Sequence, residues 1–409
     1  MEMKIHKSSL ILFLIFFLAD HCFWLVNANV QSLTNEFCWM LIVSMFFCTV
    51  FVSDCGKLFN TVFYEFGFLV LFTIVMGGYS TIQAVQLHGQ SLMQGILPQR
   101  FMISAFLLYF VLMKRINNKK GYLERIESVF LAVGCTEMIL YISQYFLINT
   151  VRFLNITVSY RLDGIRMNLG AIGIPFVIFN SINTVFKNKK LRVFDVLCIA
   201  AGLFYSFSIA KTRITLVAYM LAIIGGYLVW KKGGKRKFWA FFIIAVFIVC
   251  LSQTSLYSYL IEGINNIDLS SQTRSLGRAY YLKRIAEHPI FGCGYINTNN
   301  ANAVAYSGMN SISTGTIAWV DLGVYGLTFF FGLLGFTWFV ILYSKMAIKA
   351  YKIAKKGNLA YWMYMVYSIV ISPNGTGFIW YISSTVAFVV WICLIEGNYK
   401  EMNSDITEN

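Results

Sequence analysis

Long uninterrupted blocks of apolar residues run through this chain, and they limit the folds that it can adopt. A membrane-spanning helix needs about 20 predominantly apolar residues, and fewer when neighbouring helices shield it. Because 58% of the 409 residues are hydrophobic and only 12% are charged, no soluble fold could keep so much apolar surface out of water. The blocks also lack the alternating pattern of barrel strands. The sequence therefore predicts an all-α polytopic membrane protein with a single integral membrane domain over residues 1–409.

Twelve apolar blocks are expected to be transmembrane helices. They cover residues 10–26, 37–52, 58–76, 101–113, 126–148, 169–186, 193–209, 214–230, 238–251, 317–343, 361–371 and 378–395. The first block is kept as a span rather than a removed signal peptide, because it has no convincing cleavage site and contains Asp20 and His21.

The basic residues orient these spans. Clusters of bases lie between the blocks at 114–125, 187–192, 231–237 and 345–356. With the amino terminus inside, every cluster falls on the cytoplasmic side, as the positive-inside rule requires. We therefore expect both termini in the cytoplasm and the chain in a bacterial cytoplasmic membrane. The chain has 33 bases and 18 acids, and the excess of bases serves this orientation. No nucleic-acid partner is expected.

Three longer segments then lie on the outer face, at 77–100, 149–168 and 252–316. The last is a large external loop. Residues 271–288 within it can form a short amphipathic helix at the membrane interface, and a turn-rich stretch at 291–313 follows.

Arginine dominates among the bases expected on the outer side. These bases are Arg100, Arg152, Arg161, Arg166, Arg213, Arg274, Arg278 and Arg284, with Lys211 and Lys283. Bases on the translocated side oppose the orienting rule. A guanidinium grips phosphate through two hydrogen bonds, so the set predicts an anionic ligand, a lipid phosphate or diphosphate. For a single arginine, such as Arg100 or Arg152, the alternative is an anchor that snorkels to lipid headgroups.

Some of these arginines are better placed than others. Arg213 is expected at the start of a helix, where backbone N–H groups add to an anion site. Arg274 and Arg278 are four residues apart and so share one face of the interfacial helix. We assign these three to diphosphate binding. Arg161 and Arg166, in a segment that also holds tyrosine and amide residues, are expected with Arg284 to contact the substrate. A simple loop contact between Arg161 and Asp163 is the alternative.

Three stretches resemble the signature of the O-antigen ligase and polymerase superfamily. They are Arg274-Ser-Leu-Gly-Arg278 with the following Pro289-Ile-Phe-Gly292-Cys-Gly294 turn, the Ser208-Ile-Ala-Lys-Thr-Arg213 hairpin, and Asp321-Leu-Gly323-Val-Tyr-Gly326. The resemblance covers roughly residues 169–343. It implies transfer of an undecaprenyl-diphosphate-linked oligosaccharide on the outer face of the membrane by metal-independent inverting glycosyl transfer, without a cofactor. In such enzymes the two arginines that correspond to Arg213 and Arg278 hold the diphosphate. Besides this oligosaccharide and the bilayer, a chain-length regulator is a candidate partner.

One departure from the family pattern favours a polymerase over a ligase. Ligases of this superfamily carry a His-Asn pair before the acidic residue of the Gly-x-x-Gly run, whereas residues 311–319 here contain no histidine. The acceptor-activating base is then Asp321, with Glu287 and His288 as alternatives. Asp321 could instead be a helix-terminal acid paired with an arginine.

A transporter remains the competing class of function. A flippase for the same lipid-linked oligosaccharide should line its spans with arginines and show two repeated halves. The acids expected within the bilayer also raise the idea of a proton relay; they are Asp20, Glu65, Glu137 and Asp195. The crowding of arginines in the outer loops favours the enzyme.

Overall fold

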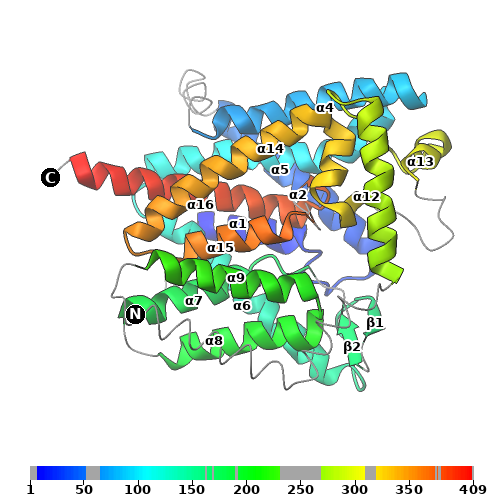
Figure 1. Cartoon of the computed structure of the whole chain (residues 1–409). Coiled ribbons are helices and arrows are strands. Elements are labelled where there is room, and N and C mark those ends of the chain that lie inside the picture. The colour runs from blue at the N-terminus through cyan, green and yellow to red at the C-terminus, as the bar shows by residue number, and fades with distance from the viewer. Residues whose placement is uncertain are drawn as a thin grey trace.

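The structure is a computed structural model that describes residues 7–51, 65–161, 164–167, 170–188, 192–230, 269–308, 319–373, 375 and 379–407. These residues are almost entirely α-helical (Figure 1). The helices are α1 (Lys7–Ala19), α2 (Ala28–Phe51), α4 (Gly67–His88), α5 (Leu92–Asn118), α6 (Tyr122–Leu147), α7 (Ile174–Asn188), α8 (Val193–Phe204), α9 (Arg213–Val229), α12 (Leu269–Glu287), α13 (Ala301–Ser307), α14 (Val324–Lys355), α15 (Ala360–Ile371) and α16 (Ile382–Thr407). A π-helix η1 (Tyr205–Ala210) continues α8, and a short 3₁₀ helix η2 (Trp319–Leu322) precedes α14.

The helices have the length and composition of membrane spans. Among the described residues, seven are long and apolar enough to cross a bilayer: α2, α4, α5, α6, α8 together with η1, α14 and α16. Shorter apolar helices lie at α1, α9 and α15. The all-α membrane protein that the sequence predicts is confirmed. The number of twelve spans stays a prediction, and the block at 238–251 lies outside the described residues.

The helices pack side by side around α5. Helix α5 contacts α2, α4 and α16, and residues 104–113 in its middle are almost wholly buried. A second group of helices forms around the contacts of α7 with α8 and of α9 with α15. In Figure 1, α12 runs across one end of this bundle, while both ends of the chain lie at the opposite end. The helix expected at 271–288 is therefore confirmed as α12, which covers residues 269–287.

The segment at 77–100, expected outside the membrane, is mostly helical, and its place relative to the membrane stays a prediction. Helix α4 continues to His88 and α5 begins at Leu92, so only a tight turn separates them. Gly89 ends α4 with a φ of 64°, and Ser91 begins α5 with a capping box to Gln94. Two polar residues of this segment, Gln90 and Gln99, make buried hydrogen bonds within the structure.

A short antiparallel hairpin also departs from the helical prediction. Strands β1 (Val158–Arg161) and β2 (Gly164–Met167) pair with Val158 opposite Met167. The hairpin lies in the expected outer segment 149–168 and packs against η1.

Candidate functional site

Helix α12 packs against the bundle through one buried aromatic residue and through the turn that follows the helix. Tyr281 is fully buried and stacks on Phe329 of α14, with ring centres 4.3 Å apart. The helix also packs on η2, the short helix that contains Asp321. The face of α12 that contains Tyr281 therefore packs against the start of α14.

The Pro289–Gly294 turn inserts into a break in α14. At Gly332, φ is 64° and ψ is −163°, so the backbone there is not helical. The N–H of Cys293 donates to the carbonyl of Phe329 at 2.7 Å, and the N–H of Leu333 donates to the carbonyl of Pro289 at 2.8 Å. A helix break in an apolar surrounding leaves polar backbone groups without partners. The turn supplies those partners.

The glycines of the motif are required by this close approach. A Cβ on Gly292 would lie 2.5 Å from the Gly332 nitrogen, and a Cβ on Gly294 would lie 2.6 Å from the Ser80 carbonyl oxygen of α4. Both glycines also have positive φ. The Pro-x-x-Gly-x-Gly pattern is therefore a structural element that joins the loop to two helices.

Side chains at the end of α4 hold the same segment from the other side. The His88 imidazole nitrogen Nε2 lies 2.9 Å from the Cys293 carbonyl oxygen. The Gln90 amide donates to the Tyr295 carbonyl at 2.9 Å and accepts from the Asn297 N–H at 2.8 Å. The segment after α12 is thus fixed between α4 and α14.

The Asp321–Gly326 run begins α14 at a crowded point. The N–H of Val324 donates to the Ser372 carbonyl at the end of α15 at 3.2 Å. Gly323 has a φ of 51°, and a Cβ there would lie 2.6 Å from the Pro373 carbonyl carbon. Asp321 itself is exposed. Burial, and then the negative charge of Asp321, raise the pKa of Tyr381, which places this tyrosine near the carboxylate.

Arg278 lies against the beginning of α14. Its guanidinium carbon is 5.6 Å from the centre of the Tyr325 ring, within the range of a cation–π contact. Tyr325 belongs to the run that starts at Asp321. The structure therefore brings the loop arginine and the acidic run to one place, while Arg274, one turn earlier on α12, is exposed.

Arg284 has a different environment from the one expected of a substrate contact. Its Nη1 donates to Glu287 at 2.9 Å, and its guanidinium carbon lies 4.1 Å from the centre of the Tyr306 ring. The Tyr306 hydroxyl also donates to Glu287 at 3.0 Å. The hydrogen bond from Arg284 lowers the pKa of Glu287, which makes that carboxylate a weaker base. Arg284 holds the loop together, and its ion pair occupies the Glu287 carboxylate, which makes Glu287 a poor candidate base.

Arg166 supports the Ser208–Arg213 hairpin, which leads into α9. Its Nε donates to the Ala210 carbonyl at 3.1 Å, at the end of the π-helix η1. Lys211 follows with a φ of 46°, and α9 begins at Arg213. Arg213 therefore begins a helix as expected. The side chains of Arg161 and Arg213 lie outside the described part of the structure.

Local ion pairs and hydrogen bonds account for Arg100 and for two of the acids expected within the bilayer. Arg100 pairs with Glu36 of α2 and lies 4.2 Å over the Phe101 ring. Glu137, fully buried, accepts the N–H groups of Ile172, Gly173 and Ile174 at 2.9 to 3.2 Å where α7 begins. A local structural role thus explains both, as it does for Asp20, which accepts the Tyr141 hydroxyl at 2.8 Å.

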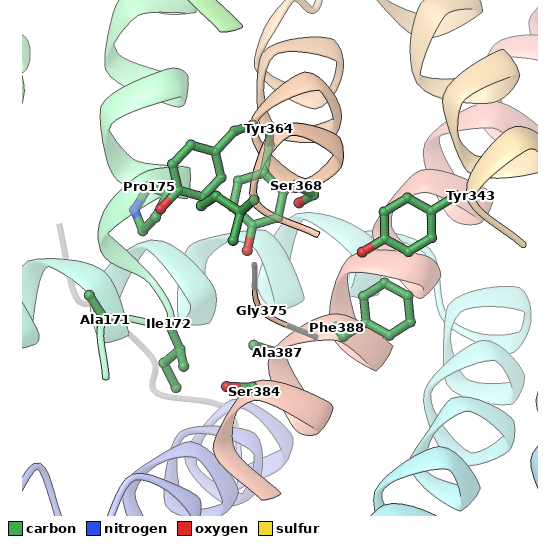
Figure 2. A pocket seen from close by; sticks show the side chains of 12 residues that line it. Ala171, Ile172, Pro175, Tyr343, Tyr364, Ser368, Gly375, Ser384, Ala387 and Phe388 are labelled. Carbon is green, nitrogen blue, oxygen red and sulfur yellow. The ribbon is translucent and has the colours of Figure 1, made fainter. Parts of the chain in front are cut away.

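A cavity of about 150 Å³ lies between the start of α7, the second half of α15, the first turns of α16 and the middle of α14. In Figure 2, Tyr343 and Phe388 border it on one side and Ala171 and Ile172 on the other, with Ser384 on α16. None of the predicted arginines whose side chains the structure describes lines this cavity. The hydroxyl-bearing residues of α15, namely Tyr364, Tyr367 and Ser368, also line it. Their spacing of three and four residues was the sequence signal that could have revealed it.

Helix packing connects the cavity wall to the Ser208–Arg213 hairpin. Helix α15 packs along α9, and Tyr367 lies 4.9 Å from the ring centre of Tyr219. At its carboxyl end, α15 leads to Ser372, which contacts the start of α14. The cavity wall thus connects the helix that begins with Arg213 to the run that begins with Asp321.

Among the described residues, no three His, Cys, Asp or Glu side chains gather closely enough to hold a metal ion. A scan against models of known protein families finds none that matches this chain, and no curated protein matches it either.

Proposed function

We propose that this protein is a polysaccharide polymerase that joins undecaprenyl-diphosphate-linked oligosaccharide repeat units on the outer face of a bacterial cytoplasmic membrane. The product would be an O-antigen, a capsule or an exopolysaccharide. The observation that carries the proposal is the position of Arg278, on a helix that crosses the end of the bundle, against the start of α14 beside exposed Asp321. A positioned guanidinium and an exposed carboxylate are the two groups that this reaction needs.

The proposed reaction is a direct displacement at the anomeric carbon. The acceptor hydroxyl oxygen bonds to that carbon while the bond to the diphosphate oxygen breaks, which inverts the configuration. The hydroxyl proton passes to Asp321. Negative charge grows on the departing lipid diphosphate, and Arg278, with Arg274 and Arg213, stabilises it in place of a metal ion.

The orientation that goes with this proposal puts α12 outside the cell and both termini inside. The large external loop expected at 252–316 would then cover the site, and a chain-length regulator could approach the same face. A polymerase is preferred over a ligase because residues 311–319 hold no histidine.

The test uses purified protein in lipid nanodiscs with lipid-diphosphate repeat units, a chelator and no nucleotide sugar. We expect a ladder of lengthened glycans. Loss of one positioned donor to transition-state charge typically lowers a rate about 100-fold, so Arg278→Lys, which keeps the charge and loses the bidentate geometry, should lower elongation by about that factor. Lys283→Ala is the matched control, because Lys283 is exposed on the same helix.

Three results would contradict the proposal. Equal elongation by Arg278→Lys and the unmodified protein would remove Arg278 from the site. Movement of the lipid across the bilayer without lengthening would identify a flippase. Transfer of the glycan only to a different acceptor lipid would identify a ligase.

A further inference from the structure

A groove between α2 and α5 lies at the other end of the molecule from the α12 loop. It has a volume of about 610 Å³. Helix α5 begins beside the loop, where Gln90 and Gln94 contact residues 295–297, and ends at the groove. Its 27 residues span about 40 Å at 1.5 Å per residue, close to the full thickness of a bilayer with its headgroups. The groove and the loop therefore face opposite leaflets.

The two walls of the groove differ in chemistry. Helix α2 contributes a stripe that includes Leu41, Met45 and Cys48, which are spaced as one helix face. The last turn of α5 contributes Lys114, Arg115 and Lys119. One end of the groove is thus basic, and an apolar stripe leads away from it along α2. We call this feature the basic groove.

The dimensions of the basic groove match one lipid molecule. Thr49, at the basic end, and Leu41 are eight positions apart in α2, a rise of about 12 Å. The hydrocarbon half of one leaflet is about 15 Å thick. An acyl chain that lies along the stripe would place its phosphate at the level of the α5 bases.

The bases have a second role to be separated from this one. Lys114 donates to the Thr49 carbonyl at 3.3 Å and so covers the end of α2, where helix carbonyls favour a cation. Arg115 lies 3.5 Å from the Tyr122 hydroxyl through one nitrogen, and a guanidinium has five N–H donors. Lys119, the residue that ends α5, is exposed. Arg115 and Lys119 are thus the residues that can reach a phosphate.

We propose that the basic groove is a binding site for an anionic glycerophospholipid of the leaflet opposite the α12 loop, with the phosphate on Arg115 and Lys119 and one acyl chain on Leu41, Met45 and Cys48. Basic pockets between transmembrane helices are suited to such headgroups. This inference is independent of the polymerase proposal.

The test measures lipid retained by the purified full chain from detergent that contains equal amounts of phosphatidylglycerol and phosphatidylcholine, by native mass spectrometry. We expect preferential retention of phosphatidylglycerol. The Arg115→Gln/Lys119→Gln variant should reduce that preference at least about fivefold, because the attraction of one base to anionic lipid at a membrane surface raises the affinity by roughly fivefold. Lys356→Gln, which removes an exposed charge at the end of α14, should leave it unchanged. Equal preference in all three proteins, or an equal loss in Lys356→Gln, would overturn the proposal.

A second measurement uses the native thiol in the groove. Cys48 is exposed, so its alkylation by N-ethylmaleimide can be followed by peptide mapping. Phosphatidylglycerol should slow the alkylation more than phosphatidylcholine does, and inorganic phosphate should have no effect. Protection by phosphate alone would identify an anion site without a lipid chain, and equal rates with both lipids would contradict the specificity proposed here.

Discussion

At the scale of single residues, three glycines decide whether the loop can join the bundle. Gly292 and Gly332 face each other so closely that a methyl group on either would meet backbone atoms, and Gly294 meets α4 in the same way. Each also has a positive φ, which a side chain disfavours. A side chain at any of these positions would destabilise the fold in two separate ways, through the backbone conformation and through steric overlap.

The two effects can be separated by substitution. Gly89→Ala, at a φ of 64° with no atom near the added methyl group, should cost only the backbone conformation, about 1–2 kcal/mol. Gly292→Ala should cost a further 1–3 kcal/mol or so, because the methyl group enters a packed site. Thermal unfolding of the purified proteins, followed by intrinsic fluorescence, measures the difference. A Gly292→Ala variant as stable as Gly89→Ala would show that the turn is not inserted into α14.

Glu287 predicts a pH dependence for the loop. The hydrogen bond from Arg284 lowers its pKa. A carboxyl with a lowered pKa in the folded state stabilises that state above its unfolded pKa of about 4.3, and this contribution is lost as the pH falls through the lower folded value. The difference in melting temperature between the unmodified protein and Glu287→Gln should thus be constant from neutral pH to about pH 5 and shrink below it. A difference that persists in acid would contradict the ion pair.

At the scale of elements, α12 depends on its contact with α14. The ring of Tyr281 fills this contact, but its hydroxyl is buried with no hydrogen-bond partner among the described residues. A buried hydroxyl without a partner lowers stability. The ring and the hydroxyl therefore act in opposite directions.

Substitutions at Tyr281 should show this opposition. Tyr281→Phe keeps the stacking and removes the unsatisfied group, so it should raise the unfolding free energy by about 1 kcal/mol. Tyr281→Ala should lower it by about 3–5 kcal/mol through the cavity left behind and release α12 from α14. The melting temperatures, with limited proteolysis of the loop, test both. A destabilised Tyr281→Phe would mean that the hydroxyl has a partner.

The elements that could be predicted from the sequence are those with a local signal. Apolar length located the apolar helices, and the amphipathic pattern of residues 271–288 located α12. The turn between α4 and α5 was missed, because Gln90 and Gln99 look like loop residues until their buried partners are known. The break at Gly332 and the cavity between α7, α14, α15 and α16 depend on contacts between segments distant in the chain. Of the candidate site, the nearness of Arg278 to the Asp321 run was expected, whereas the engagement of Arg284 by Glu287 was not.

At the scale of the whole molecule, the bundle has two chemically distinct ends. One end carries α12 and the Ser208–Arg213 hairpin, where the Ala210 carbonyl accepts a hydrogen bond from Arg166. The other carries the basic groove at the ends of α2 and α5. The positive-inside rule assigns the latter to the cytoplasm.

This assignment predicts a labelling pattern in intact cells. In a background without native cysteines, Lys283→Cys on α12 should react with a membrane-impermeant maleimide from outside. Lys356→Cys, exposed at the end of α14, should react only after the cells are permeabilised, and the background protein should not react. The opposite pattern would reverse the orientation and place α12 in the cytoplasm.

The turn at 289–294 also has a consequence for how this protein is made. A chain emerges from the ribosome with its amino-terminal part first, so the turn has left the tunnel before the helix that it completes. The carbonyl and N–H groups around Gly332, which the helix itself does not pair, therefore have partners that are already synthesised when they reach the membrane. A deletion upstream that delays passage of the turn across the membrane would leave that helix interrupted in hydrocarbon, even though its own sequence is intact.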